Sequence, residues 1–174
     1  MALIFDFVYF FINYVVAFLP SRKLRSIIYF ILSKGKISLQ STIAMNVKIL
    51  DIRGVIIKKN SNINAGSILD GRGATLTISE NVDIASNVSI WTCQHDVNTH
   101  STNCSDVHVG KNVWIASGST VLPNVTIGDN SVIASSSVVS RSVYKNTLSG
   151  GIPAKKIRDI KRDIKKLDPI RRFR

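Results

Sequence analysis

Aliphatic residues recur every six positions over most of this chain of 174 residues, and this period is the feature that most restricts its fold. From Val109 onward the chain divides into the blocks VGKNVW, IASGST, VLPNVT, IGDNSV, IASSSV and VSRSVY, each of which begins with Ile or Val. A period of six fits neither an amphipathic helix nor one long alternating strand. It fits a strand of about four residues followed by a corner of about two, which together form one side of a prism.

The same frame continues upstream in groups of three blocks. The block-opening residues are Ile37, Ile43, Ile49, Ile57, Ile63, Leu69, Ile78, Ile84, Ile90, Val109, Ile115, Val121, Ile127, Ile133 and Val139. The fifth residue of a block is Val or Ser except at Arg53, Gly73 and Gln94, each in the last block before an insertion. Fifteen blocks in groups of three predict an all-β fold, a parallel β-helix of about five coils whose opening aliphatic residues point inward.

Charge divides the chain into a nearly neutral body and two basic ends. Residues 37–154 carry eight Lys/Arg and seven Asp/Glu, whereas residues 155–174 carry ten and three, and residues 1–36 carry five and one. This distribution argues against a nucleic-acid groove on the body. It favours ends that lie near an anionic surface, so we expect a cytoplasmic protein that associates with the inner face of the membrane. The three segments define an N-terminal extension, a β-helix domain and a basic tail.

The N-terminal extension is predicted to form two helices over residues 2–33, with a turn near Pro20. Residues 2–19 are apolar apart from Asp6 and Asn13, and apolar residues at helical spacing follow the turn. The first run lacks the basic region and cleavage site of a signal peptide, and its length is borderline for a membrane span. Three roles remain open: attachment at a membrane surface, packing against the body or another subunit, and a true span.

The C-terminal tail is also predicted to be helical. Its apolar residues recur at nearly helical spacing after Pro153 and are Ile157, Ile160, Ile164 and Leu167. This pattern predicts a helix within residues 155–174 that ends near Pro169 and has a basic outer face.

The two cysteines, Cys93 and Cys104, are eleven residues apart and form no CxxC motif. A single pair at this spacing predicts neither a metal site nor a disulfide framework. We expect free thiols in a reducing compartment.

Residues 75–158 resemble the bacterial hexapeptide acyltransferases, especially the maltose and galactoside O-acetyltransferases and the capsule or colanic-acid O-acetyltransferases. The matching segments are TLTISENVDIASNVSI at 75–90, TCQH at 92–95, VGKNVWIASGSTVLPNVTIGDNSVIASSSVV at 109–139 and SGGIPAKKIRDI at 149–160. The resemblance implies a left-handed β-helix, an exception to the usual right-handed crossover, with a loop extruded at 96–108. It further implies a homotrimer with active sites between adjacent subunits, and acetyl transfer from acetyl-CoA to a sugar hydroxyl without a metal.

Direct acetyl transfer from a thioester to a hydroxyl needs a general base, a donor for the oxyanion and a slot for the pantetheine arm. By resemblance, His95 is the base, and the backbone N–H of Ser117 is the oxyanion donor. Either Asp96 or a backbone carbonyl would orient the His95 ring. His100 and His108 are expected to be solvated loop residues. No nucleophilic Ser or Cys is required, because no acyl-enzyme forms.

The resemblance also assigns binding positions. Trp114 either lines the pantetheine slot or covers a face of the coils. The remaining cofactor positions are Ser135, Ser140 and Arg141 and, near the phosphates, Lys155 and Arg158. Asn64 and Asp70 lie roughly where the sugar acetyltransferases contact their acceptor, and the alternative is that both are ordinary corner residues. The acceptor is expected to be a sugar, either lipid-linked or soluble, in surface-polysaccharide synthesis.

Three other functions remain open. An N-acetyltransferase acting on an amino sugar would use the same base and slot. A non-catalytic scaffold would need only the stacked coils. A β-helical carbonic anhydrase would need a third zinc-binding histidine on an earlier coil, and the sequence has no His before His95. The serine acetyltransferase segment Asp-His-Ala-Thr-Gly is absent, which argues against serine as the acceptor.

Overall fold

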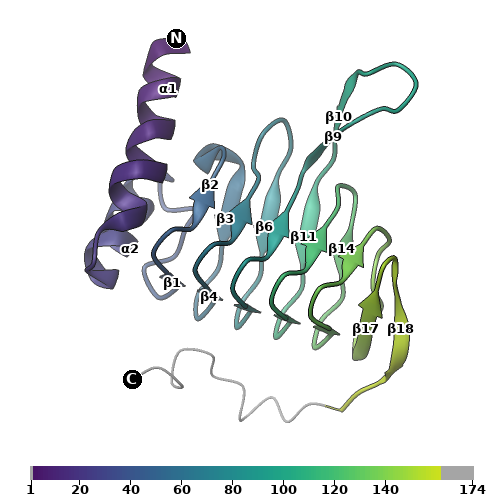
Figure 1. The fold of residues 1–174 in the computed structure, drawn as a ribbon. Helices are drawn as coiled ribbons and strands as arrows, with labels where there is room; N and C mark the ends of the chain where they lie inside the picture. The colour runs from purple at the N-terminus through teal and green to yellow at the C-terminus, as the bar shows by residue number, and fades with distance from the viewer. Residues whose placement is uncertain (1, 162–174) are drawn as a thin grey trace.

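The computed structural model describes residues 2–161, which form an elongated prism with two helices at one end (Figure 1). The helical end consists of α1 (Ala2–Phe10), a π-helical turn (Phe11–Val15), a 3-10 turn (Val16–Phe18) and α2 (Arg22–Leu32). The prism is built from β1 (Thr42–Ile43), β2 (Lys48–Ile49), a 3-10 turn (Ile52–Gly54), β3 (Val55–Ile57), β4 (Asn62–Ile63), β5 (Ile68–Leu69), β6 (Leu76–Ile78), β7 (Asp83–Ile84), β8 (Ser89–Ile90), β11 (Val107–Val109), β12 (Trp114–Ile115), β13 (Thr120–Val121), β14 (Thr126–Ile127), β15 (Val132–Ile133), β16 (Val138–Val139), β17 (Thr147–Gly151) and β18 (Ala154–Asp159). A hairpin of β9 (Cys93–His95) and β10 (Thr102–Cys104) projects from it.

Three sheets form the three sides of the prism. The first side contains β3, β6, β11 and β14, the second contains β1, β4, β7, β12, β15, β17 and β18, and the third contains β2, β5, β8, β13 and β16. The chain visits the sides in this order and pairs each strand in parallel with the equivalent strand one coil further on. The predicted left-handed parallel β-helix is confirmed, and five complete coils lie within residues 2–161.

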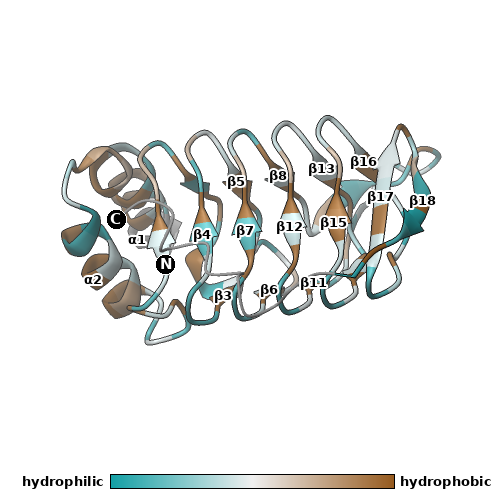
Figure 2. Cartoon of the chain, turned by 90° about the horizontal axis from the view of Figure 1, so that it is seen from below, coloured by the Kyte–Doolittle hydropathy of each residue, from teal (hydrophilic) through white to brown (hydrophobic). Residues whose placement is uncertain are grey.

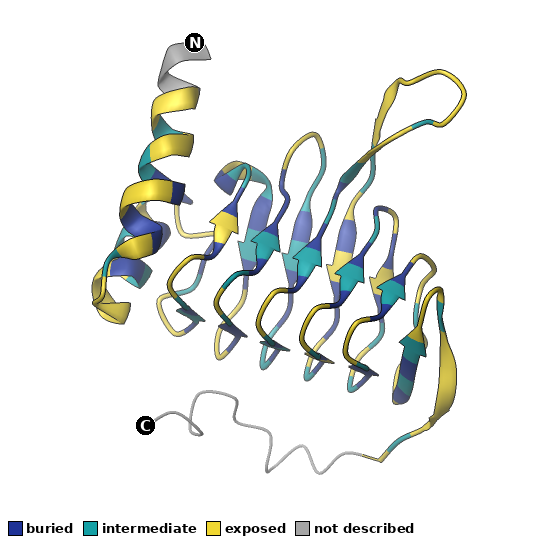
Figure 3. Ribbon diagram, viewed as in Figure 1, coloured by how far each residue is buried: buried dark blue, intermediate teal, exposed yellow. Residues whose placement is uncertain are grey.

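The core follows the six-residue frame. All fifteen predicted block-opening aliphatic residues are at most 2% exposed (Figure 3). Buried serines at the fifth position donate to carbonyls one coil away: Ser61 Oγ lies 2.8 Å from Ser79 O, and Ser131 Oγ lies 2.7 Å from Tyr144 O. Because each hydroxyl has a partner, it can replace a valine without leaving an unpaired polar group in the core.

An asparagine column runs along the corner between the first and second sides. The side-chain amide of Asn81 donates to Asn112, that of Asn112 donates to Asn130, and that of Asn130 donates to Asn146, over 2.9–3.2 Å. All four residues have φ between 57° and 61°. Asparagine adopts this left-handed conformation more readily than most residues, so it can turn the corner and link successive coils.

The N-terminal helices close the open edge of the first coil. The side-chain amide of Asn13 donates to Ile49 O over 3.0 Å, and Ile49 N–H donates back to Asn13 Oδ1 over 2.8 Å. Buried Arg25 donates from Nε to Ile43 O over 3.1 Å. These side chains supply the partners that another coil would otherwise provide to the edge.

The two predicted helices are confirmed, with Pro20 between them. The Ser21 hydroxyl accepts from the N–H of Leu24 over 3.3 Å and caps the start of α2. Within residues 2–161, no helix combines the length and apolar character that a membrane span requires.

The predicted C-terminal helix is wrong over residues 155–159. These residues belong to β18, which pairs antiparallel with β17 and covers the last parallel edge of the second side. The edge of β17 offers a row of unpaired backbone groups. Residues 155–159 pair with that edge as a strand, although their apolar residues have a nearly helical spacing. The rest of that prediction, over residues 162–174, lies outside the described residues.

The prediction of free cysteines is also wrong. Cys93 and Cys104 form a disulfide at the base of the β9–β10 hairpin, with their Cα atoms 4.0 Å apart. Antiparallel pairing places the two residues opposite each other, a contact that their spacing in sequence does not reveal. The prism resumes at Val107, so His108 lies in β11 and is not the loop residue that we expected.

Candidate active site

His95 ends β9 on the projecting hairpin and is exposed to solvent. Its Nδ1 lies 3.4 Å from His100 O and 3.5 Å from Thr102 Oγ1. If Nδ1 carries the ring proton and donates to the His100 carbonyl, Nε2 keeps its lone pair and can accept a proton. Of the two orienting groups that we considered, the backbone carbonyl is the one close to the ring.

Asp96 has a different role from the one considered. Its Oδ1 accepts from the N–H groups of Asn98 and Thr99, both over 2.9 Å, and from the Thr99 hydroxyl over 3.1 Å. These backbone hydrogen bonds, first that of Thr99, lower the pKa of the Asp96 carboxyl. The carboxylate therefore organises the tip of the hairpin.

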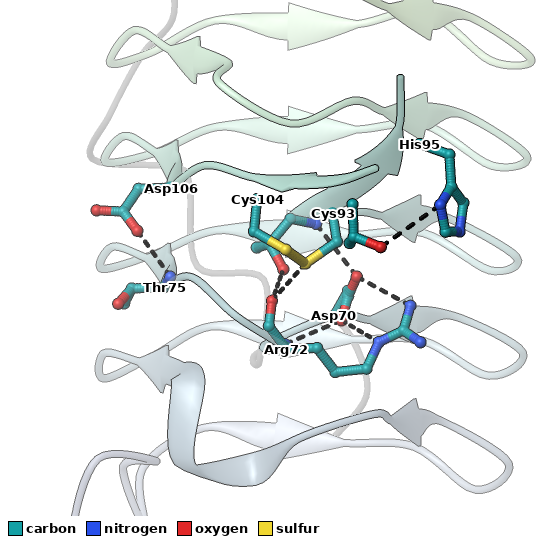
Figure 4. The surroundings of a disulfide bond; sticks show 9 residues. Asp70, Arg72, Thr75, Cys93, His95, Cys104 and Asp106 are labelled. Atoms are coloured by element: carbon teal, nitrogen blue, oxygen red, sulfur yellow. Dashed lines mark hydrogen bonds and ion pairs between the residues drawn. A yellow bond between two sulfur atoms is a disulfide. The ribbon is translucent and has the colours of Figure 1, made fainter. Parts of the chain in front are cut away.

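The base of the hairpin is anchored by Asp70 and Arg72 (Figure 4). Asp70 is fully buried and forms an ion pair with Arg72, whose Nε lies 2.9 Å from Oδ1. Its Oδ2 accepts from the N–H of Thr92 over 3.3 Å, and the Thr92 hydroxyl donates to Arg72 O over 3.0 Å. Asp70 thus holds the segment leading to His95. Because its carboxylate is buried within the chain, it is not accessible to a sugar acceptor in a single copy.

Asn64, the other expected acceptor residue, also links coils. Its side-chain amide donates to Ile84 O over 2.8 Å and lies 3.5 Å from Asp83 Oδ1. The side chain is half-buried, so it fits the alternative reading as a corner residue that joins the second and third coils.

The candidate residues lie in two separate groups on the prism. The first group lies at the corner between the third and first sides and contains Asp70, His95, Ser140 and Arg141. The second group lies on the second side and at its corner with the third and contains Asn64, Trp114, Ser117, Ser135, Lys155 and Arg158. The third side separates the two groups, so a single chain does not bring them together.

The Ser117 amide lies at a corner of the prism, between two amides that have partners. Its neighbours Ala116 and Gly118 donate to carbonyls of adjacent coils over 3.0 and 3.1 Å. Within the described part of the chain, the Ser117 N–H donates to no backbone carbonyl. The equivalent amides of Ser86 and Ser135 share this property, so the choice of Ser117 rests on the family resemblance.

The expected cofactor-binding side chains are all exposed. Trp114 on β12 leaves 42% of its surface open, which is large for an indole on a face of stacked coils. The cations Arg141, Lys155 and Arg158 are also exposed, as is Ser140. Within residues 2–161, these groups are open to a phosphate or a pantetheine arm.

An open pocket of about 550 Å³ borders the hairpin base and was not foreseen from the sequence. It is lined by Gly73, Ala74, Cys104, Ser105, Asp106, His108, Asn124 and Thr126. Asp106 is engaged in the fold, because its Oδ1 accepts from the N–H of Thr75 over 2.7 Å. Among the described residues, no group of three or more His, Cys, Asp or Glu side chains is placed to hold a metal ion.

Residues 106–141, which cover the fourth and fifth coils, match the family described as bacterial transferase hexapeptide (six repeats). The fourth and fifth coils therefore have the sequence pattern of the bacterial hexapeptide transferases. Galactoside O-acetyltransferase from Escherichia coli (strain K12) is 38% identical over 91 residues, which cover 49% of this chain and 45% of that protein. The chain spans about half the length of the curated relatives that it matches.

Two solved structures share the fold of this chain over most of its length. The hexapeptide-repeat acetyltransferase of Vibrio cholerae O1 biovar eltor, complexed with acetyl-CoA, is 25% identical with a TM-score of 0.76, and the match covers 91% of this chain and 86% of that one. A maltose O-acetyltransferase of Clostridium difficile 630 is 26% identical with a TM-score of 0.77 and the same coverage of both chains. The predicted resemblance to this class of protein is confirmed.

Proposed function

We propose that this protein is an acetyl-CoA-dependent O-acetyltransferase that acts on a sugar hydroxyl in surface-polysaccharide synthesis, such as that of capsule, exopolysaccharide or O-antigen. The observation that carries the proposal is an exposed histidine on a hairpin fixed by a disulfide and by the buried carboxylate of Asp70. The β-helix that bears it is shared with acetyltransferases, one of them complexed with acetyl-CoA.

The proposed reaction is a direct transfer. Nε2 of His95 takes the proton of the acceptor hydroxyl as its oxygen attacks the thioester carbonyl carbon. The new C–O bond forms, the C–S bond breaks, and the departing CoA thiolate takes the proton from the imidazolium. The Ser117 N–H stabilises the oxyanion of the tetrahedral intermediate. The His100 carbonyl steadies the imidazolium through Nδ1–H.

The proposed cofactor slot uses residues of both groups. Trp114 packs against the pantetheine arm, and Ser135, Ser140 and Arg141 contact the cofactor. The exposed cations Lys155 and Arg158 lie near its phosphates. Because His95 lies at the corner between the third and first sides and Trp114 lies on the second side, the proposed site is complete only between two copies of the chain. A homotrimer closes such interfaces through a threefold axis.

The acceptor and the location complete the proposal. The basic and apolar N-terminal end favours a lipid-linked sugar at the inner face of the cytoplasmic membrane, with peripheral membrane contact through residues 1–36. An amino sugar acceptor would use the same base, and transfer to nitrogen is the second candidate. In this proposal Asp70 positions the hairpin and Asn64 borders the acceptor.

The test combines binding with transfer. Calorimetry with acetyl-CoA is followed by incubation with a panel of sugars and amino sugars and by mass spectrometry of the products. We expect acetyl-CoA binding and O-acetylation of a sugar. In His95→Gln, kcat should fall by roughly 10²–10⁴-fold with an unchanged acetyl-CoA Kd, because only proton transfer is lost.

The matched control is His100→Asn, which keeps the backbone carbonyl beside His95. Asparagine also tolerates the φ of 54° at this position, so kcat should stay near wild type. Undiminished turnover in His95→Gln would rule out the general-base role. Absence of acetyl-CoA binding to the wild-type protein would favour a scaffold, and acetylation confined to amino groups would favour the N-acetyltransferase.

A further inference from the structure

We propose that the helical end of the prism docks on an anionic membrane, with the apolar outer faces of α1 and α2 entering the interface and an adjoining lysine pocket binding lipid phosphates. The inference deepens the proposed function, because it specifies how membrane contact is made. The inference rests on the proposed function only for the reason why the protein would bind a membrane. The structural observations that support membrane binding do not involve the active site.

Both helices are rich in apolar residues, which are brown in Figure 2, and many of these side chains are exposed. The exposed residues are Phe7, Tyr9, Phe10, Tyr14, Val15, Phe18, Leu24, Ile27, Phe30 and Ile31. The opposite faces pack on the first coil through buried residues that include Ile12, Val16 and Tyr29. The set keeps this exposure although Phe10 stacks on Tyr14 and the Phe30 ring lies against Gly35, so a large apolar surface stays open to solvent within the described chain.

Helix α2 has the pattern of a helix that lies in a membrane interface. Leu24, Ile27 and Ile31 follow one another along one exposed face and are 46%, 48% and 64% exposed. Exposed Arg22 and Lys23 stand at the start of the helix. Cations at the ends of an apolar face can reach lipid headgroups while that face enters the acyl boundary.

A basic pocket adjoins the far end of α2. It has a volume of about 480 Å³, is open to solvent and is lined by Lys34, Gly35, Lys36, Ser38, Gln40, Ile56, Ile57, Lys58, Lys59 and Glu80. Two of the lysines have partners: Lys59 Nζ lies 3.8 Å from Glu80 Oε1, and Lys36 Nζ donates to Arg53 O over 2.6 Å. Four ammonium groups against one carboxylate leave a net positive site.

The pocket and the apolar face are continuous. Ile31 lies one helical turn before Lys34, and Gly35 turns the chain into the first coil with a φ of 80°. The Phe30 ring lies against Gly35, within about 3.7 Å of the position that a Cβ would occupy there. A lipid phosphate bound by the lysines would thus lie at the border of the apolar surface, as it does in a bilayer.

Charge complementarity favours an anionic bilayer over a second copy of the chain. The exposed apolar face is bordered by Arg22, Lys23 and the pocket lysines, with Asp6 as the acidic residue on α1. Apposing two such ends would bring like charges together, whereas an anionic surface attracts each lysine. In the proposed trimer, a threefold axis carries all three ends to the same side, so that one membrane can engage them together.

Vesicle flotation of the full chain tests the inference. We expect the protein to float with phosphatidylcholine vesicles that contain phosphatidylglycerol and to bind weakly to phosphatidylcholine alone. Lys58→Gln with Lys59→Gln should weaken binding roughly fivefold for each lysine. The matched control, Lys145→Gln with Lys156→Gln, removes the same charge from the far end of the prism and should bind like the wild type.

The apolar contribution is tested by Ile27→Asp with Ile31→Asp, against Tyr144→Asp as a control at an exposed position on the later coils. The helix variant should lose vesicle binding while its melting temperature and oligomeric mass stay unchanged, because both positions face solvent. Absence of wild-type binding to anionic vesicles would overturn the inference. Equal losses of vesicle binding in the two lysine double variants would also overturn it. A smaller oligomer in the helix variant would overturn it too, because the apolar face would then contact another copy of the chain.

Acetyl transfer to a soluble acceptor, measured on the same samples, separates this inference from the proposed function. Vesicle binding without transfer would refute the enzyme and leave the docking surface standing. Acetyl transfer without vesicle binding would refute the docking surface and leave the proposed enzyme activity standing.

Discussion

Buried polar side chains decide how the open end of the prism is closed. Asn13 takes the place of a peptide group beside Ile49, and the guanidinium of Arg25 donates to backbone carbonyls. Burial lowers the pKa of Arg25 and raises that of its neighbour Tyr29 to about 12. Among the described residues, the Tyr29 hydroxyl is the buried side-chain group without a hydrogen-bond partner. The N-terminal helices therefore supply hydrogen bonds to the backbone groups at the strand edge, but they also bury the Tyr29 hydroxyl without a partner.

Tyr29→Phe is predicted to stabilise the protein by about 1 kcal/mol at neutral pH, because a buried hydroxyl without a partner is lost. The variant should also change the alkaline behaviour. A raised tyrosine pKa favours the fold below pH 10, and this contribution disappears as the pH rises from 10 through about 12. Denaturant unfolding at neutral and alkaline pH should show a smaller alkaline loss in Tyr29→Phe. Equal losses in both proteins would mean that the Tyr29 hydroxyl is solvated in the fold.

The sequence predicted residue roles where a repeat or motif constrains them. Every block-opening aliphatic residue is buried, because the six-residue frame directly encodes the inward direction. The roles of Asp70 and Asn13 could not be predicted, since each depends on a backbone group at least 22 residues away in sequence. His95 was predicted to be the base from the family resemblance, whereas the carbonyl beside its Nδ1 follows from the local hairpin geometry.

At the scale of elements, the β9–β10 hairpin is the element on which the proposed catalysis depends most directly. The disulfide, the buried Asp70 and the Thr92 contacts fix its base, while Asp96 organises its tip. The six-residue repeat predicted an insertion here, because Gln94 stands where the fifth residue of a block should be Val or Ser. The repeat could not predict that the insertion forms two paired strands. The same limit explains the C-terminal error, since β18 forms only because the edge of β17 is available.

Cys93→Ser with Cys104→Ser should loosen the hairpin that carries His95. Misplacing the base by about an ångström should reduce kcat between roughly ten- and a hundredfold with an unchanged acetyl-CoA Kd. The free energy of unfolding should fall by about 2–3 kcal/mol, since a short covalent loop is lost from the unfolded chain. Reductant should reproduce the kcat loss in the wild type and have no effect on the double variant. Full activity in the double variant would show that Asp70 and Thr92 suffice to hold the hairpin.

At the scale of the whole molecule, the prism separates its functional surfaces. The helical end carries an apolar and basic surface, and the projecting hairpin carries His95. Most expected cofactor positions lie on the second side or at its corner with the third, whereas Ser140 and Arg141 lie at the same corner as the hairpin. Since the third side of the prism separates His95 from Trp114, the proposed chemistry requires two copies of the chain.

Mixing two inactive variants tests this central claim most directly. His95→Gln and Trp114→Ala chains are assembled separately and, by unfolding and refolding together, as an equal mixture, and acetyl transfer from acetyl-CoA is measured in each sample. If each site combines His95 of one copy with Trp114 of the next, random assortment restores about one quarter of the sites while each variant alone stays inactive. A mixture that stays as inactive as its components would contradict a site shared between copies.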